Sequence, residues 1–167
     1  MHTLFKCRRS VRTYREDPVP AALVEELLRA AMSAPSAQNG QPWEFVVVTD
    51  ANALERLAGC SPYSAHVKQA PLAIVPCYRK ELKRPDFVLI DMGICSDNIL
   101  LEAAAQGLGA VFVGIAPMAD RMENVRRALN LPDHLEPFAL IPCGYPAGEI
   151  REKDRFDPAR IHYLGEH

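Results

Sequence analysis

The chain of 167 residues has the length of one compact domain, with 49% hydrophobic and 24% charged residues. These proportions exclude an intrinsically disordered protein and are typical of a globular one. The 19 basic and 21 acidic residues leave a formal net charge of −2, which disfavours a nucleic-acid partner held by many phosphate contacts. We therefore predict a single domain over residues 1–167 that does not bind nucleic acid.

The cysteines are scattered along the chain and lack the CxxC spacing of metal or redox sites: Cys7, Cys60, Cys77, Cys95 and Cys143. We interpret them as free, mostly buried thiols in a reducing cytoplasm, and we expect no metal. No apolar run approaches the roughly 20 residues of a membrane span, and the amino terminus lacks the apolar core of a signal peptide. We therefore predict a cytoplasmic protein without a membrane partner.

Helical and strand patterns follow one another through the first half of the chain. Residues 21–34 place apolar side chains at helical spacing, and Pro35 ends this predicted helix because proline disfavours helical geometry in the preceding residue. Residues 43–49 are rich in β-branched and aromatic residues and predict a buried strand, followed by a short helix over 52–58. Residues 71–78 predict a second strand, whose two prolines indicate a position near a sheet edge or at strand ends.

The second half begins with residues 87–106, a predicted helix that is apolar on nearly all sides. Such a helix needs apolar cover all round, and a small domain has few layers to supply it, so a dimer would provide that cover. A third strand is predicted over 110–115, a helix over 118–129 and a fourth strand over 137–145. A polar tail, residues 148–167, completes this mixed α and β order.

Several common functional motifs are missing from the sequence. GLGAVF lacks the third glycine of a dinucleotide fingerprint and runs from helix into strand, the reverse of the required order. The sequence also lacks GxxxxGK[ST], HExxH and GxSxG, and its histidines show no ligand spacing. Rossmann, common hydrolase and metal sites are therefore not supported.

The segment KCRRSVRTYR near the amino terminus holds five of the nineteen basic residues. Arg8 and Arg12 would share one face of a helix, while Arg9 and Ser10 could turn toward the same point. Guanidinium groups and a hydroxyl together suit a phosphate monoester, whose oxygens accept charge-assisted hydrogen bonds. The alternative is a solvated surface cluster neutralised by the acidic residues that follow it.

A loop of small and amide-bearing residues, PSAQNGQP, follows the first predicted helix and includes Ser36, Gln38, Asn39 and Gln41. Amides donate and accept hydrogen bonds at once, so such a loop can bind a flat heterocycle with alternating carbonyls and ring nitrogens. The same residues are also common in ordinary loops. Composition alone leaves both interpretations open.

Five segments, in chain order, cover nearly the whole sequence: RRSVRTYREDPV, APSAQNGQPWEF, APLAIV, LLEAAAQGLGAVFVGI and GYPAGEIREKDRFDPARIHY. Together and in this order they resemble the nitroreductase family of FMN-dependent oxidoreductases. The resemblance implies an α+β, three-layer fold in which helices flank a central, mainly antiparallel sheet. It also implies a homodimer that binds FMN at its interface, with the tail 148–167 extended around the partner subunit.

The resemblance implies two groups of residues for the phosphate end of FMN. The first group matches contacts to the phosphate and to the ribityl or pyrimidine part, and consists of Arg8, Arg9, Ser10 and Arg12. The second is a phosphate-binding pair near the carboxyl terminus, Lys153 and Arg155. The anion expected at the basic segment is therefore the phosphate of FMN.

Two further groups correspond to contacts with the flavin ring. The loop that meets the flavin corresponds to Ser36, Asn39 and Gln41, with Pro35 and Ser36 expected to serve the cofactor of the other subunit. The strand whose backbone approaches flavin N5 corresponds to Val113 and Gly114. A glycine there would allow close approach of the backbone to a ring.

The chain also departs from the family pattern. Family members often place an Asn and a basic residue before the second strand, whereas this chain has PYSAHVKQAP. Either Tyr63, His66 or Lys68 takes their place in the substrate pocket, or the contact is absent. The chain is short and lacks room for a large helical insertion, so the lid of the pocket stays undefined.

The activity that the resemblance implies is a ping-pong transfer of hydride from NADH or NADPH through FMN to a nitroaromatic, a quinone or a similar small-molecule oxidant. No side-chain acid or base is obligatory, because the cofactor carries the chemistry. The alternatives are a relative that fragments flavin or removes halogen reductively, and a non-catalytic FMN-binding protein.

Overall fold

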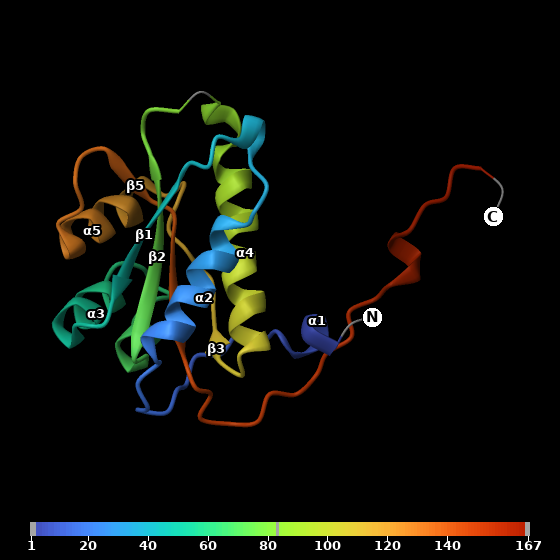
Figure 1. Ribbon diagram of the computed structural model, residues 1–167, viewed down its shortest axis with the longest axis horizontal. Helices are drawn as coiled ribbons and strands as arrows, with labels where there is room; N and C mark the ends of the chain where they lie inside the picture. Colours follow the sequence, from blue (N-terminus) through green and yellow to red (C-terminus); the bar gives the residue numbers. More distant parts are fainter. Residues whose placement is uncertain (1–2, 83, 166–167) are drawn as a thin grey trace.

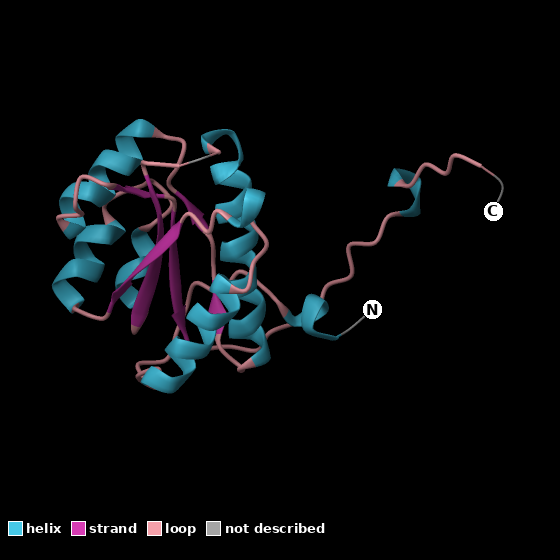
Figure 2. Ribbon diagram, turned by 45° about the horizontal axis from the view of Figure 1, so that its top comes forward, coloured by secondary structure: helices cyan, strands magenta, loops and turns pink. Residues whose placement is uncertain are grey.

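The computed structural model describes residues 3–82 and 84–165, which form a six-stranded sheet between two layers of helices (Figures 1 and 2). The strands are β1 (Trp43–Val48), β2 (Leu72–Arg79), β3 (Gly109–Ala110), β4 (Val113–Gly114), β5 (Leu135–Pro137) and β6 (Ala139–Gly144). Their order is β1-β2-β6-β3, with β4 also paired to β6 and β5 to β2, and these pairs are antiparallel. The predicted α+β, three-layer fold is confirmed.

Two helices cover each face of the sheet. α2 (Ala21–Met32) and α4 (Val88–Ala105) lie on one face, and α3 (Ala51–Ala58) and α5 (Ala119–Leu129) lie on the other (Figure 1). α1 (Thr3–Cys7) lies outside these layers. Short 3₁₀ turns occur at Ala37–Asn39, Ala65–Gln69, Pro85–Phe87 and Pro158–Arg160. No helix in the described part of the chain is long and apolar enough to cross a membrane.

The alternation of side chains along β2 supplies both cores. Leu72 and Ile74 pack with the helices α2 and α4, whereas Ala73 and Val75 pack on the opposite face with α3 and α5. Successive side chains of a strand point to opposite faces, so a strand that is buried on both sides must be apolar at every position. This explains the continuous apolar run that predicts the strand.

The prolines of β2 do not place it at a sheet edge. β2 pairs with β1 on one side and with β5 and β6 on the other. Pro71 precedes the strand, as the strand-end alternative predicts, but Pro76 lies within it, and its carbonyl accepts a hydrogen bond from the Phe138 N–H at 2.8 Å. Phe138 lies in the break between β5 and β6, where the missing proline N–H is tolerated. β2 is therefore an interior strand that lies next to the edge strand β1, which agrees with a position near a sheet edge.

The third and fourth predicted strands are each divided in two, as β3 and β4 and as β5 and β6. The register across the first break is continuous, because Ala110 is opposite Cys143 and Val113 is opposite Leu140. Between them, the Val111 N–H donates to the Pro142 carbonyl at 3.4 Å. Pro142 has no N–H to return that bond, so the ladder is interrupted although the strands stay aligned.

The five cysteines are free, and Cys60, Cys77, Cys95 and Cys143 are buried, as the sequence predicts. Burial raises the pKa of the Cys77, Cys95 and Cys143 thiols to about 12. These thiols therefore stay protonated and unreactive near neutral pH.

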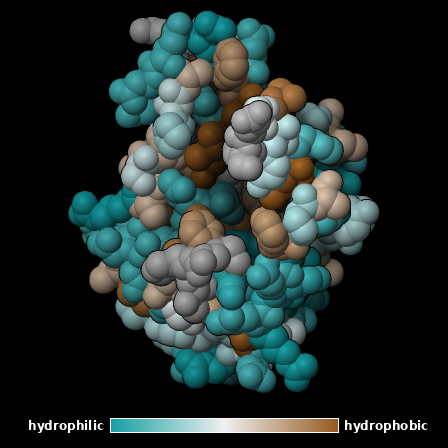
Figure 3. Space-filling model, turned by 90° about the vertical axis from the view of Figure 1, so that its right-hand side faces the viewer, coloured by the Kyte–Doolittle hydropathy of each residue, from teal (hydrophilic) through white to brown (hydrophobic). Residues whose placement is uncertain are grey.

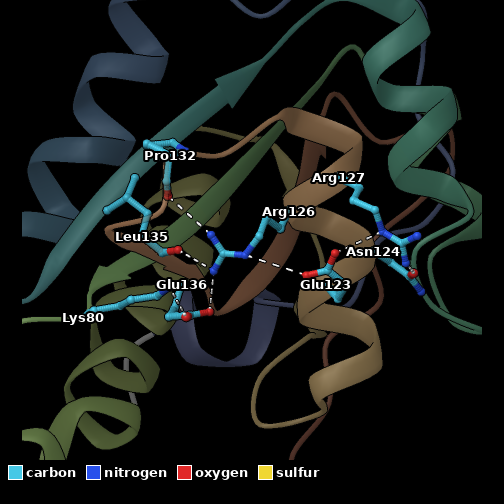
Figure 4. A network of polar contacts seen from close by, with 8 residues as sticks. All are labelled: Lys80, Glu123, Asn124, Arg126, Arg127, Pro132, Leu135 and Glu136. Carbon is cyan, nitrogen blue, oxygen red and sulfur yellow. Dashed lines mark hydrogen bonds and ion pairs between the residues drawn. The ribbon is translucent and has the colours of Figure 1, made fainter.

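Arg126 attaches α5 to the sheet at β5 (Figure 4). The Arg126 guanidinium donates to the Leu135 carbonyl at 2.8 Å and to the Glu136 carboxylate at 2.8 Å, and it also reaches the Pro132 carbonyl at 3.4 Å. The Arg126 side chain is 19% exposed, so these bonds are partly shielded from water. The next residue, Arg127, pairs with Glu123 on the solvent side and is 70% exposed.

We predict that Arg126→Met lowers the free energy of unfolding by about 2 kcal/mol, because it leaves partly buried acceptors without their charged donor. Urea unfolding at fixed protein concentration measures the change. Arg127→Met is the matched control, since its exposed ion pair contributes less than about 1 kcal/mol. Equal unfolding midpoints for the two variants would refute this role of Arg126.

Candidate functional site

The basic amino-terminal segment is held against the edge of the sheet by β3. Ser10 forms a bridge with Ala110, and the Val11 N–H donates to the Ala110 carbonyl at 3.1 Å. A Cβ at Gly109 would lie 2.6 Å from the Val11 Cβ, a distance that real Cβ atoms do not show. Gly109 is therefore required for the close approach of the two segments.

Tyr14 fixes the other end of this segment. Its hydroxyl lies 2.6 Å from the Val11 carbonyl and 3.1 Å from the Pro142 carbonyl, and its backbone forms a bridge with Pro146. Residues 10–14 are thus held between β3 and the chain that follows β6. The position of Arg12 is consequently set by the sheet rather than by a local helix.

A segment near the amino terminus, residues 5–9, lies beside a segment of the carboxyl-terminal tail, residues 151–156, and the tail passes α1 in Figure 2. The Lys153 N–H donates to the Lys6 carbonyl at 3.4 Å, and Arg9 Nη1 donates to the Arg151 carbonyl at 3.4 Å. Between the two segments is a hollow of about 270 Å³. Four predicted phosphate ligands line it, Arg8, Arg9, Lys153 and Arg155, and Asp154 is also in its lining. Such a convergence of cations suits a ligand with several anionic oxygens.

A larger cleft of about 660 Å³ has Arg12 in its lining. Two groups of predicted site residues line it: Tyr63, His66 and Lys68 from one segment, and Val113 and Gly114 from β4. A Cβ at Gly114 would meet an ordinary contact at 3.6 Å, so the glycine is not required by packing within the chain. The structure therefore brings Arg12, the β4 backbone and all three substrate-pocket candidates to one cleft.

His66 has an unmet hydrogen-bonding group in this cleft. Its Nε2 atom is buried and has no hydrogen-bond partner among the described residues. Burial lowers the pKa of His66, and the positive charge of Arg12 lowers this pKa further. A neutral imidazole with a free nitrogen can bind a polar atom of a ligand, whereas neighbouring Lys68 is already paired with Glu55 at 3.1 Å.

The amide-bearing loop is held in a strained conformation. Three of its residues that are not glycine have positive φ angles: Gln38, Asn39 and Gln41. The Ala37 N–H donates to the buried Asp91 carboxylate at 3.1 Å, and Arg79 donates to the Gln41 carbonyl at 2.7 Å. Because such backbone angles cost free energy, they persist where the surrounding contacts hold them, often at functional sites.

Within one chain the loop lies far from Arg12 and its cleft. Asp91 anchors the loop near the amino-terminal end of α4, whereas β3 and the basic segment follow the carboxyl-terminal end of that helix (Figure 1). α4 has 18 residues and is therefore about 27 Å long. The expected ring-contacting residues Pro35, Ser36, Asn39 and Gln41 are thus separated from the other site residues.

Comparisons with known proteins identify the family. The family model described as "Nitroreductase family" matches residues 6–61 and 59–145. The chain belongs to the nitroreductase family. A Methanothermobacter thermautotrophicus protein with the provisional name NADH dehydrogenase/NAD(P)H nitroreductase is 46% identical over 158 residues, covering 94% of this chain and 83% of that protein.

Solved structures of nitroreductase-family proteins agree with this assignment. One is a Clostridium acetobutylicum protein provisionally described as an NADH oxidase, with a TM-score of 0.93 and 42% identity, covering 98% of this chain and 99% of that one. Another is an FMN-dependent nitroreductase from Clostridium difficile, with a TM-score of 0.91 and 28% identity, covering 99% and 100%. The predicted family and its enzyme class, an NAD(P)H oxidoreductase, are confirmed.

Sequence reasoning missed one residue that contacts two lining residues of the cleft, Arg121 of α5. Its guanidinium donates to the Gly114 carbonyl at 3.2 Å and lies 5.4 Å from the centre of the Tyr63 ring. In the sequence, Arg121 is one of several charged residues on a polar helix, and no spacing distinguishes it from Arg126 or Arg127. Its role becomes visible when α5 is packed against the sheet.

We predict that the pKa of His66 in the flavin-free protein lies below the ordinary value of 6.5, and that Arg12→Met raises it without restoring it, because burial remains. An NMR titration of the His66 ring, assigned by the loss of its signal in His66→Gln, measures both values. Because the folded state disfavours the charged form, the stability contributed by His66 is complete above about pH 6.5 and is lost as the pH falls through the folded value. A pKa at or above 6.5 would contradict this environment.

Proposed function

We propose that this nitroreductase-family chain is an FMN-dependent oxidoreductase that transfers hydride from NADH or NADPH to a small-molecule oxidant such as a nitroaromatic or a quinone. The observation that carries the proposal is the meeting of Arg8, Arg9, Lys153 and Arg155 from opposite ends of the chain at one hollow. A surface cluster needs no such convergence across the length of the sequence. A related structure that is itself described as an FMN-dependent nitroreductase supports the same cofactor.

The donor set fits a phosphate monoester joined to a flat heterocycle. Four of the five cations that line the hollow, Arg8, Arg9, Lys153 and Arg155, would hold the phosphate, with Ser10 beside them. Arg12 and His66 would bind polar atoms of the ribityl or pyrimidine part, since His66 Nε2 has no partner among the described residues. Val113 and Gly114 would present backbone beside the ring.

Bound FMN would supply the redox chemistry, by accepting hydride from NAD(P)H and passing it to the oxidant. The protein would orient the ring between β4 and the segment that carries Tyr63 and His66. The positive charge of Arg12 would stabilise negative charge that develops during reduction. No side-chain acid or base would be required for this transfer. In the described part of the chain, the ionisable groups in the lining of the cleft are Arg12, Tyr63, His66 and Lys68, and no carboxylate is among them.

We also propose a cytoplasmic homodimer that completes the site. α4 has an exposed apolar strip formed by Leu89, Ile90 and Ile94, the middle one 59% exposed, and apolar patches are visible on this side of the molecule (Figure 3). A partner packed on this strip would bury it and supply a loop like that at residues 35–41 to each cleft. The extended tail, residues 148–164, would lie around the partner, and each chain would be one domain (Figure 1).

The direct test is a visible spectrum of the purified protein, before and after anaerobic addition of NADH and then NADPH. We expect a flavin spectrum that is bleached by at least one of them and recovers when a quinone or a nitroaromatic is added. Flavin that neither nicotinamide reduces would favour a flavin-binding protein or another donor. No flavin after reconstitution with FMN would overturn the proposal.

Arg12→Ala is expected to weaken FMN binding tenfold or more, because it removes a charge-assisted contact that contributes about 1.5–3 kcal/mol. Titration with FMN, followed by fluorescence quenching, measures the dissociation constant. Arg15→Ala is the matched control in the same segment, since Arg15 pairs with Asp17 at 2.9 Å. Overlaying titration curves for wild type and Arg12→Ala would refute the assignment of Arg12.

The dimer is expected to sediment at about twice the chain mass of 18.5 kDa at micromolar concentration. Ile90→Glu should dissociate it, because the variant would bury a charge in an apolar interface. Ala51→Glu adds the same charge to α3, on the other face of the sheet, and should leave the dimer intact. A wild-type protein that sediments as a monomer would contradict the proposed interface.

A further inference from the structure

Arg121 connects the two walls of the candidate cleft. One wall is β4 with Phe112, whose ring packs edge-on against Phe138 with centroids 5.7 Å apart. The opposite wall is the segment from Pro62 to Gln69, which includes Tyr63. Arg121 belongs to neither wall, yet its guanidinium donates to the Gly114 carbonyl at 3.2 Å and lies 5.4 Å from the Tyr63 ring centroid.

The Tyr63 ring needs such a contact to hold a defined position. Its backbone is fixed by a turn, in which the Tyr63 N–H donates to Ser61 Oγ at 3.1 Å and the Ser61 N–H donates to Ser64 Oγ at 2.9 Å. The side chain, however, is part of a residue that is 68% exposed, so packing restrains it weakly. A cation over the ring face supplies the missing restraint.

The chemistry of arginine suits both contacts at once. A planar guanidinium donates hydrogen bonds from its edge while its face stacks on an aromatic ring, which an ammonium group cannot do. Both contacts of Arg121 are to neutral groups, a carbonyl and a phenol ring. Its positive charge is therefore not cancelled by them and acts on whatever occupies the cleft.

We propose that Arg121 is a positioning residue of the oxidoreductase, which fixes the Gly114 backbone and the Tyr63 ring relative to each other and favours the reduced cofactor by its charge. The inference rests on the proposed function and deepens it. Arg121 sets the geometry in which the oxidant meets the cofactor, and Tyr63 forms the wall against which a planar oxidant lies.

Four variants separate the two effects of Arg121. Arg121→Met removes the charge and both contacts, whereas Arg121→Lys keeps the charge and loses the combined geometry. Tyr63→Leu removes the ring and leaves the charge. Arg127→Met is the matched control, because it removes an exposed cation from the same helix that pairs with Glu123 at 3.2 Å.

Three measurements apply to these variants: the reduction potential of the bound flavin by dye equilibration, kcat and KM for 1,4-naphthoquinone with a saturating nicotinamide, and hydrogen exchange of residues 113–116 in the flavin-free protein. We expect Arg121→Met to make the two-electron potential more negative by about 30 mV, equivalent to a tenfold change in the equilibrium constant. We also expect it to lower kcat/KM for the quinone about tenfold and to speed the exchange.

Arg121→Lys should keep the wild-type reduction potential and lower kcat/KM for the quinone. Tyr63→Leu should also keep the potential and lower kcat/KM, but it should leave the hydrogen-exchange rate of residues 113–116 unchanged. The Arg121 proposal is overturned if Arg121→Met and Arg127→Met match the wild type in potential, quinone kinetics and exchange. If Arg121→Met does not fold, then wild-type quinone kinetics in both Arg121→Lys and Tyr63→Leu overturn it instead. A wild-type protein that binds no FMN, or whose FMN no nicotinamide reduces, refutes the proposed function. The hydrogen-exchange measurement uses the flavin-free protein and therefore tests the contacts of Arg121 independently of that function.

Discussion

The contact between Val11 and Gly109 is the constraint on which the candidate site depends. It allows the basic amino-terminal segment to lie directly against β3, at a distance that no larger residue at position 109 would permit. Because β3 leads into β4 within a few residues, the same contact brings Arg12 to the cleft that Val113 and Gly114 line. Tyr14 then fixes the direction in which the segment leaves the sheet.

Within the described chain, the residues expected to bind the flavin lie in two separate places, near opposite ends of α4. The basic segment lies beside β3, which follows the carboxyl-terminal end of α4, and the strained amide loop is anchored by Asp91 near the other end of that helix. Asp91 and Arg79 together hold backbone angles that cost about 1–3 kcal/mol each. The exposed apolar side chains of α4, Leu89, Ile90 and Ile94, are also in the amino-terminal half of that helix.

Positive charge is concentrated at one place on a protein whose net charge is negative. A net charge of −2 gives no overall attraction for an anion, yet cations from distant parts of the sequence meet in the hollow beside α1. The cleft beyond Arg12 has a different character, with aromatic side chains and a neutral histidine next to the β4 backbone. Under the proposed function, recognition of a phosphate and accommodation of a planar ring would fall to separate surfaces of the fold.

The periodic patterns were enough to predict α2, α4, α5 and the strands β1 and β2 closely, because hydrophobic spacing depends on local geometry. The order of the motifs was also enough to indicate the family. The interruption of the sheet at Pro142 and the interior position of Pro76 could not be predicted, since the cost of a missing N–H depends on which strand lies opposite. Arg121 was likewise hidden, because a guanidinium that reaches Gly114 and Tyr63 differs from other helix cations only in what the packed neighbours present to it. The spacing of apolar residues in the sequence therefore determines the helices and strands, whereas contacts between distant segments form only when the sheet and its helices pack together.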